Sequence, residues 1–353
     1  MWLPILSAFL VTFFSTPLVI KFALKYKLIT DTKVNKHPGH THQGILPRAG
    51  GLAIFLGVLV ALLPFSSNKI VIYILLGGLL AVIVGLFDDR FDLSPYWRFI
   101  TNIAVAIIAV LGGIGIPYIS NPFNSLIKLD QFVFSFNLFG QGFELLWLAD
   151  LAAILWIVWC MNMVNWSKGV DGQLPGYVLI TAFFLGLLSL RFSAHDISKE
   201  IVTLMCFVTA ASYLGFLPHN FYPQKILPGY AAGSLAGYLL GVLSILSWGK
   251  LGTMLLLLAL PLTDALVVMT RRISQKKSPF KGDRQHFHHT LLDMGWSRRR
   301  IAIFYWLVSL IIGSLTLFMD SEKKVYALLL LVLILSSIVI WSFNFVKQLQ
   351  KNI

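Results

Sequence analysis

Apolar stretches of membrane-spanning length follow one another along almost the whole sequence, and they constrain the fold more than any other feature. A helix needs about 20 predominantly apolar residues to cross a bilayer. These stretches predict an all-α integral membrane protein of about eleven transmembrane helices, built as one domain over residues 1–353. Runs of that length, or nearly so, occur at about 1–22, 50–66, 70–87, 99–118, 144–161, 174–190, 201–217, 230–248, 252–270, 301–319 and 325–345.

The composition agrees with a chain that lives in lipid. Only 12% of the residues are charged and the mean hydropathy is +0.79, whereas soluble domains carry about 25% charged residues. An ordinary soluble protein is therefore excluded, and the bilayer is an expected partner. Cys160 and Cys206 lie inside apolar runs, so we interpret both as core residues and expect neither a disulfide nor a metal pair.

The orientation follows from Lys and Arg, which gather in the cytoplasmic loops of membrane proteins. With the N-terminus outside, 21 of the 28 basic residues fall on the cytoplasmic side. This predicts an outer N-terminus, a cytoplasmic C-terminus and a retained first span at 1–22. The net charge of +13 is then explained without a nucleic-acid partner. The cytoplasmic segments are 21–49, 88–98, 162–173, 218–229, 271–300 and 346–353.

The outer loop at 119–142 has a different pattern. Between Lys128 and Leu138 the residues alternate, with Phe132, Phe134 and Phe136 at every second position. Such alternation is typical of a strand. We expect a small β-hairpin at about 122–140 on the outer surface.

Four polar segments carry the residues capable of chemistry. The first contains Asp88 and Asp89, followed by Arg90 and Asp92, at the inner end of the third apolar run. Adjacent carboxylates at a membrane boundary repel each other and are costly to desolvate. A divalent cation such as Mg²⁺, which prefers hard oxygen ligands, resolves that conflict. A solvated, charged helix end is the alternative.

The second segment closes the fifth apolar run with Asn162, Asn165, Lys168, Gly169 and Asp171. Glycine lets backbone N–H groups approach a ligand closely, and Asn and Asp side chains can bind a base or a sugar. A turn at the membrane interface is the alternative, because Asn, Asp and Gly favour turns.

The third segment lies in the basic loop and holds Lys281, Arg284, His286, His288 and His289. Together these residues would make a good anion site. Zinc binding is disfavoured because neither a cysteine nor a helical i, i+4 histidine pair accompanies them. A simple cytoplasmic anchor would account for the Lys and Arg residues but not for three close histidines.

The fourth segment places Arg48 just before the paired glycines Gly50 and Gly51, where it would hold a phosphate. An ordinary loop-to-helix junction explains the same residues. All four segments face the cytoplasm in the predicted topology. Their common side favours one composite site.

Together these residues resemble the polyprenyl-phosphate N-acetylhexosamine-1-phosphate transferase family, from about Asp31 to His289. They are closer to the branch that uses UDP-N-acetylhexosamine than to the branch that acts on UDP-muramoyl pentapeptide. The predicted spans and outer hairpin fit the family as well. The resemblance rests on Pro47–Gly51, Asn220–Ile226, Pro261–Asp264, Arg272 and Ser278–Phe280 through His286–His289.

The resemblance implies a phosphoryl transfer on the cytoplasmic face of the inner, or plasma, membrane. A polyprenyl (undecaprenyl) phosphate would attack the sugar-bearing phosphorus of a UDP-sugar, UMP would leave, and a cell-envelope glycan would be initiated. Catalysis of this kind depends on positioning and charge neutralisation. The implied roles are Mg²⁺ binding or lipid-phosphate activation for Asp88 and Asp89, nucleotide and sugar contacts for Asn162, Asn165 and Asp171, diphosphate binding for Arg284, His286, His288 and His289, and substrate binding for Arg48, Lys168, Gly169 and Lys225.

The chain departs from the family pattern at two positions. Lys168 stands where the family has an aspartate, and Tyr230 stands where the family has an aspartate that binds the metal. No Asp or Glu occurs between Tyr222 and Thr263. Either the Lys168 ammonium replaces part of the metal's charge, or catalysis is lost and a lipid- or nucleotide-binding protein remains. A transporter is a further alternative, disfavoured because the polar residues lie at the inner face.

The sequence leaves several features open. It fixes neither the sugar, the lipid length nor the glycan pathway, and a homodimer stays open. Asp264 lies within the ninth apolar run, where a carboxylate is either functional or a polar packing group.

Overall fold

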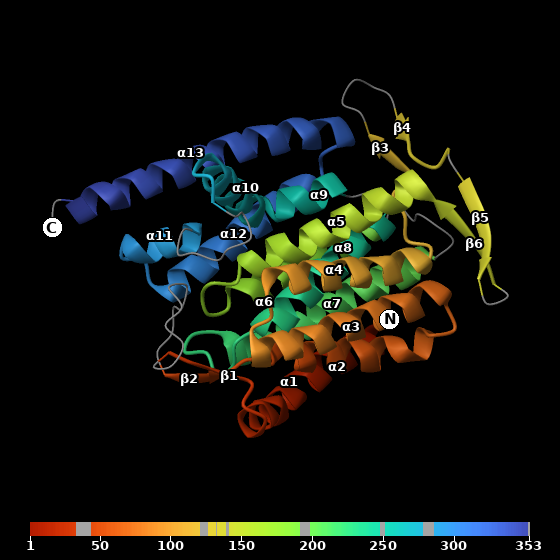
Figure 1. The fold of residues 1–353 in the computed structure, drawn as a ribbon, viewed down its shortest axis with the longest axis horizontal. Coiled ribbons are helices and arrows are strands. Elements are labelled where there is room, and N and C mark those ends of the chain that lie inside the picture. Colours follow the sequence, from red (N-terminus) through yellow and green to blue (C-terminus); the bar gives the residue numbers. More distant parts are fainter. Residues whose placement is uncertain are drawn as a thin grey trace.

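The apolar runs form helices, because within lipid a segment must satisfy its backbone polar groups internally. The computed structural model describes residues 1–32, 44–120, 126–131, 133–138, 141–190, 198–247, 251–277 and 286–351. The helices lie side by side in a bundle, and small sheets lie at its two ends (Figure 1). The elements are α1 (Trp2–Lys25), β1 (Ile29–Asp31), β2 (Ile45–Pro47), α2 (Gly50–Leu62), η1 (Leu63–Phe65), α3 (Lys69–Phe91), α4 (Pro95–Leu111), β3 (Tyr118–Ser120), β4 (Leu126–Lys128), β5 (Val133–Leu138), β6 (Gln141–Leu146), α5 (Trp147–Trp166), α6 (Gln173–Ser189), α7 (Lys199–Asn220), α8 (Gly229–Leu246), α9 (Leu251–Leu257), α10 (Ala259–Ser274), α11 (Phe287–Asp293), α12 (Arg298–Thr316) and α13 (Ser321–Lys351).

The predicted class, a helical membrane protein with only small sheets, is confirmed. Within the described residues, seven helices are long and apolar enough to cross a membrane, and the bent pair α9–α10 makes up to eight. The shorter apolar helices are Gly50–Phe65, Pro95–Leu111 and Gln173–Ser189. Each expected apolar run therefore corresponds to a helix or to the bent pair. The number of crossings and the sides of the two termini stay predictions.

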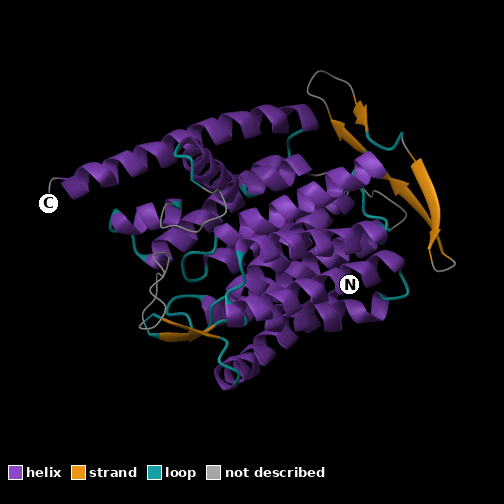
Figure 2. Ribbon diagram, viewed as in Figure 1, coloured by secondary structure: helices purple, strands orange, loops and turns teal. Residues whose placement is uncertain are grey.

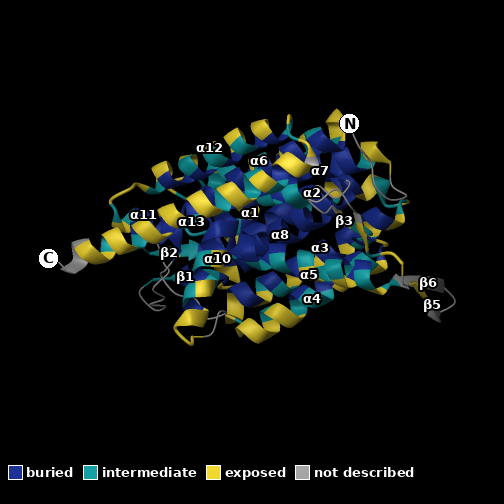
Figure 3. Cartoon of the chain, turned by 90° about the horizontal axis from the view of Figure 1, so that it is seen from above, coloured by how far each residue is buried: buried dark blue, intermediate teal, exposed yellow. Residues whose placement is uncertain are grey.

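Helix α8 forms the centre of the bundle, and its whole apolar window is buried. Figure 3 shows α8 in the buried colour, whereas α13 is largely exposed. A side chain at Gly233 or Gly237 would collide with Asn165 or with the Cys160–Met161 backbone of α5. Small residues at this spacing let two helices pack at close range. They bring the end of α5 beside the beginning of α8.

The apolar run expected at 252–270 is divided between two helices. Helices α9 and α10 meet at an angle of 83°. Pro261 has no N–H to donate to the carbonyl of Leu257, so the helix breaks there. Ser309 of α12 satisfies that carbonyl instead, with its hydroxyl 2.9 Å from Leu257 O.

The expectation of a single hairpin at 122–140 also needs correction. Two separate antiparallel pairs are present: β3 with β4, and β5 with β6 (Figure 2). In the second, Val133 pairs with Leu146 and Leu138 with Gln141, so the strands extend past the expected boundary. Phe134 is exposed, and Phe132 lies outside the described residues. On which side of a membrane these strands lie stays a prediction.

The opposite end of the bundle carries β1, β2 and α11 (Figure 1). Two elements there were not expected, because both fall in segments interpreted as loops. One is the β1–β2 pair, with Ile29 opposite Pro47. The other is the short helix α11. Every described residue of the four polar segments comes from this end of the bundle or from the loops that join its helices.

Candidate active site

Arg48 is placed by the small β1–β2 sheet. Its backbone N–H donates to Leu28 O at 2.8 Å, while the N–H of Leu227 donates to Pro47 O at 2.8 Å. These two backbone hydrogen bonds fix the end of β2 between the segment that follows α1 and the loop that precedes α8. From there the Arg48 side chain reaches α3, where its Nε donates to Asp89 Oδ1 at 3.0 Å. The first and fourth sequence segments therefore meet directly.

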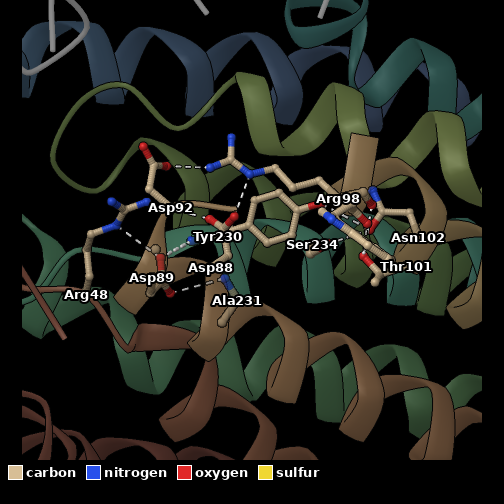
Figure 4. Close-up of polar contacts among 12 residues, drawn as sticks. Arg48, Asp88, Asp89, Asp92, Arg98, Thr101, Asn102, Tyr230, Ala231 and Ser234 are labelled. Atoms are coloured by element: carbon tan, nitrogen blue, oxygen red, sulfur yellow. Dashed lines mark hydrogen bonds and ion pairs between the residues drawn. The ribbon is translucent and has the colours of Figure 1, made fainter. Parts of the chain in front are cut away.

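Asp88 and Asp89 lie on the last turn of α3 and are both buried. Arg98, from the first turn of α4, donates its Nε to Asp88 Oδ1 at 2.5 Å and its Nη2 to Asp92 Oδ1 at 2.6 Å. Figure 4 shows the guanidinium between the two carboxylates. The sequence counted Arg98 only as a loop charge. Its spacing of ten residues from Asp88, across the α3–α4 turn, is the signal that would have found it.

Asp89 also binds the beginning of α8. Its Oδ1 accepts from the N–H of Tyr230 at 2.7 Å, and its Oδ2 accepts from the N–H of Ala231 at 3.4 Å (Figure 4). The first N–H groups of a helix have no partner within that helix. The Asp89 carboxylate, which belongs to α3, therefore caps the beginning of α8.

Lys168 follows α5 and joins this group. Its Nζ donates to Gly229 O at 2.5 Å and lies 5.7 Å from the centre of the Tyr230 ring. Desolvation lowers the pKa of Lys168, and the nearby Asp89 opposes that shift. The ammonium therefore lies where the resemblance expects a carboxylate, beside Asp89.

The two predicted asparagines have different environments. The Asn162 side chain donates to Val158 O of its own helix at 2.8 Å. Asn165 is buried, and its Oδ1 has no hydrogen-bond partner among the described residues. That oxygen faces Gly233 of α8, where an added Cβ would collide with it. Asn165 is the better candidate for a ligand contact, because a buried acceptor normally has a donor.

Asp171 is held by two residues to which the sequence assigned no role. Gln224 donates its Nε2 to Asp171 Oδ1 at 3.0 Å, and Arg298 Nη1 lies 3.7 Å from the same oxygen. Burial raises the pKa of Asp171, and Arg298 opposes the rise. Lys225, beside Gln224, is exposed, and its backbone N–H donates to His219 O at 2.8 Å.

Asp264 forms two hydrogen bonds with the histidine segment. Its Oδ2 accepts a hydrogen bond from His286 Nδ1 at 2.9 Å, and its Oδ1 accepts from the N–H of Phe287 at 2.7 Å. An ionised carboxylate can only accept a hydrogen bond, so His286 carries a proton on Nδ1. The Nε2 atom of the ring is not used in this contact. Asp264 thus joins the broken span to the histidine segment.

The other two histidines lie in the first turn of α11, next to His286. The rings of His286 and His288 are 5.8 Å apart and nearly parallel, and those of His288 and His289 are 4.3 Å apart. Gly169 lies against the His288 imidazole, where a Cβ would overlap the ring. Burial lowers the pKa of His288, and both neighbouring histidines add to the effect. His288 is therefore neutral at pH 7.

The described parts of the four segments are thus brought together: Arg48 meets Asp89, Lys168 meets the same group, and Gly169 meets His288. Lys281 and Arg284, with Ser278–Phe280, lie outside the described residues. Arg98 and Arg298 are the neighbours that only the three-dimensional contacts identify as part of this cluster. Asn220, Gln224 and Tyr230 were already noted in the sequence, and the contacts add them to the cluster.

The resemblance implies Mg²⁺ at Asp88 and Asp89, and the residues present do not fit that ion. Three of the four carboxylate oxygens already accept hydrogen bonds from Arg48, Arg98 or the first N–H groups of α8. Asp88 Oδ2 has no hydrogen-bond partner among the described residues, but Arg48 Nη2 lies 4.0 Å away. In that part of the chain, no group of three or more His, Cys, Asp or Glu side chains is placed to hold a metal ion. Magnesium is usually held by one or two carboxylates, with water and substrate phosphate completing a near-octahedral shell, and among these four oxygens only Asp88 Oδ2 accepts no hydrogen bond from the described residues.

Comparison with known proteins places the chain among membrane transferases. The family model for glycosyl transferase family 4 matches residues 71–248. A protein of Bacillus subtilis (strain 168), named a probable undecaprenyl-phosphate N-acetylglucosaminyl 1-phosphate transferase, is 30% identical over 87% of this chain and 81% of its own length. A decaprenyl-phosphate N-acetylglucosaminephosphotransferase of Mycobacterium leprae is 30% identical over 92% and 85%. An undecaprenyl-phosphate alpha-N-acetylglucosaminyl 1-phosphate transferase of Salmonella typhi is 26% identical over 99% and 94%.

The matched stretch runs from α3 to α8 and so includes Asp88, Asp89 and the segment from Asn162 to Asp171. The relatives cover most of the chain and most of their own length. The predicted family membership is confirmed: this chain belongs to glycosyl transferase family 4, together with the polyprenyl-phosphate N-acetylglucosamine-1-phosphate transferases.

Proposed function

We propose that the protein transfers N-acetylglucosamine 1-phosphate from a UDP-sugar to a polyprenyl phosphate. The names of the relatives support the lipid acceptor and the transferred sugar phosphate. The observation that carries the proposal for this chain is the convergence of its polar segments on the end of the bundle at β1, β2 and α11. The reaction would take place at the cytoplasmic face of the plasma membrane and release UMP.

The chemistry is one in-line exchange of phosphorus–oxygen bonds. An oxygen of the lipid phosphate forms a bond to the sugar-bearing phosphorus, and the bond from that phosphorus to the oxygen of UMP breaks. The electron pair of the broken bond leaves with UMP. Enzymes accelerate such a transfer by aligning the two phosphates and neutralising their charge.

The described residues divide into three proposed roles. Arg48 and Lys168 would bind phosphate oxygens, because both are basic groups close to the Asp88–Asp89 pair. Asn165 and Asp171 would hold the nucleotide or the sugar, with Asn162 beside them. His286, His288 and His289 would face the diphosphate, with Asp264 fixing the first ring.

A transfer assay on the purified protein tests the proposal. Labelled UDP-N-acetylglucosamine and undecaprenyl phosphate should give a labelled lipid product and UMP in equal amounts. UDP-muramoyl pentapeptide, offered as an alternative donor, should give none. Without lipid product from the N-acetylglucosamine donor, in either Mg²⁺ or EDTA, the proposed reaction is wrong.

A second candidate is a family member that binds nucleotide or lipid without turnover. It is favoured by Lys168 and Tyr230, which stand where the resemblance implies carboxylates. Its signature in the same experiment is saturable binding of the UDP-sugar with no lipid product. Turnover by the natural protein excludes it.

A further inference from the structure

The Asp88–Asp89 pair is already committed to partners within the protein. Asp89 accepts from the N–H groups of Tyr230 and Ala231, and so caps α8 from another helix. Gly229, just before them, has φ of +71°, and a Cβ there would collide with the Asp89 carboxylate. The beginning of α8 therefore packs closely against α3, with Asp89 as its helix cap. A metal ion at Asp89 would compete with that cap.

The charges of the group are balanced without a metal. Arg48 contacts Asp89, Arg98 contacts both Asp88 and Asp92, and the Lys168 ammonium lies close enough to Asp89 for a favourable electrostatic interaction. Three basic side chains thus face three carboxylates. A buried cluster of carboxylates attracts a divalent ion because its negative charge is uncompensated, and here that excess is absent.

Tyr230 fills the space beside the carboxylates. Its ring is flanked by Arg98, at 5.3 Å, and by Lys168, at 5.7 Å. Its hydroxyl donates to Asn102 Oδ1 at 3.2 Å, an oxygen that also accepts from Ser234 (Figure 4). Cations are attracted to the face of an aromatic ring. The tyrosine therefore holds two cations where an aspartate would have held a metal.

The same cations keep donors for an incoming anion. Lys168 carries three N–H donors, of which the structure commits one to Gly229 O. The Arg48 and Arg98 side chains are 24% and 27% exposed, whereas the Asp89 and Asp88 carboxylates that they contact are fully buried. A phosphate approaching from the open side meets the basic groups first.

We propose that Lys168, Arg48 and Arg98 form a built-in cationic centre that replaces a divalent metal ion at Asp88–Asp89 and binds substrate phosphate directly. The identity of the substrate phosphate rests on the proposed function. The first test, metal binding, does not depend on that function. The two departures from the family pattern then act together. Lys168 supplies positive charge, and Tyr230 occupies the position of the missing aspartate and stabilises that charge through its ring.

Manganese binding, measured by electron paramagnetic resonance without nucleotide, tests the proposal independently of turnover. The natural protein should show no bound Mn²⁺ at about 0.1 mM free ion, and the Lys168→Asp, Tyr230→Asp double variant should gain at least about tenfold in affinity. Lys277→Asp makes the same change of charge as Lys168→Asp, at an exposed position, and should gain nothing. Stoichiometric Mn²⁺ binding by the natural protein, lost in Asp88→Asn, would overturn the proposal.

Phosphate binding gives a second readout that needs neither a folded double variant nor turnover. In EDTA, UMP titrated by calorimetry should bind the natural protein, and Lys168→Met should weaken that binding by about tenfold. Lys277→Met is the matched control and should bind UMP normally. Equal affinity of the natural protein and Lys168→Met would contradict the cationic centre.

The transfer assay then separates the two proposals. If lipid product forms at similar rates in Mg²⁺ and in EDTA, both hold. If product forms only with Mg²⁺, the transferase stands and the metal-free centre fails. If no product forms under either condition, the proposed function fails, while the Mn²⁺ and UMP titrations still decide the cationic centre.

Discussion

Two halves of the candidate site satisfy their polar groups in opposite ways. In the carboxylate half, Asp88 and Asp89 face Arg48, Arg98 and Lys168, so each charge has an opposite charge beside it. In the histidine half, the buried His288 ring is neutral, and its Nδ1 has no hydrogen-bond partner among the described residues.

The difference separates what holds the site together from what is left for a ligand. Ion pairs and a helix cap join α3, α4 and α8 in the carboxylate half, so damage there should appear first as lost stability. The histidine half is oriented by Asp264 and by close packing on Gly169. Damage there should appear first as lost turnover.

The largest effect is expected from Gly169→Ala. The added Cβ would overlap the His288 ring and displace it, and a displacement of about 1 Å in an active site costs roughly 10²-fold in rate. Steady-state transfer rates would measure the loss. Gly252→Ala is the matched control, because a Cβ there meets no atom within 4 Å. A full rate from Gly169→Ala would show that the His288 position is not needed.

Asp264→Asn should lower kcat by roughly tenfold to a hundredfold, because a misoriented His286 no longer helps to align the diphosphate that it is proposed to face. The amide can still accept from Phe287 N–H, but it no longer offers His286 an acceptor of the same charge. Asp293→Asn, on an exposed position of α11, serves as the control. A fall in thermal stability with unchanged kcat would instead assign Asp264 to packing alone.

Arg98→Met should destabilise the fold by about 2 kcal/mol, since it leaves the buried Asp88 carboxylate without its charged donor. Thermal unfolding in detergent would report the change as a lower Tm. Arg90→Met, at an exposed arginine on the last turn of α3 that donates to the backbone carbonyl of Lys27, should shift Tm much less. Equal shifts would mean that the carboxylate half is not held by its ion pairs.

The smallest effect is a pH dependence of stability from His288. Its pKa is lowered in the folded protein, so below the ordinary value of about 6.5 the unfolded chain binds a proton that the folded chain does not. Stability should therefore fall as the pH drops from 6.5 toward the lowered pKa, by at most about 1.4 kcal/mol per pH unit. Tm measured from pH 7.5 to 5 should show this slope, and His288→Asn should flatten it.

Much of the fold followed from the sequence because lipid imposes a simple rule. An apolar run must be a helix, so each expected run became a helix or a bent pair. The exceptions have local causes: Pro261 breaks α9–α10, and strand alternation near Phe134 did not reveal that two hairpins are present. Hydropathy locates neither of them, because an apolar average does not register a proline and does not say which strands pair.

The sequence by itself determined the membrane class, the family and the residues that gather at one end of the bundle, because periodicity, charge and motif spacing are local properties. Tertiary structure alone decided their partners. It showed that Asp89 caps α8, that Arg98 joins Asp88 to Asp92, that Tyr230 lies between two cations, and that Asp264 holds His286. Those contacts join residues on different helices, and only the packing of α8 against its neighbours fixes which charges meet.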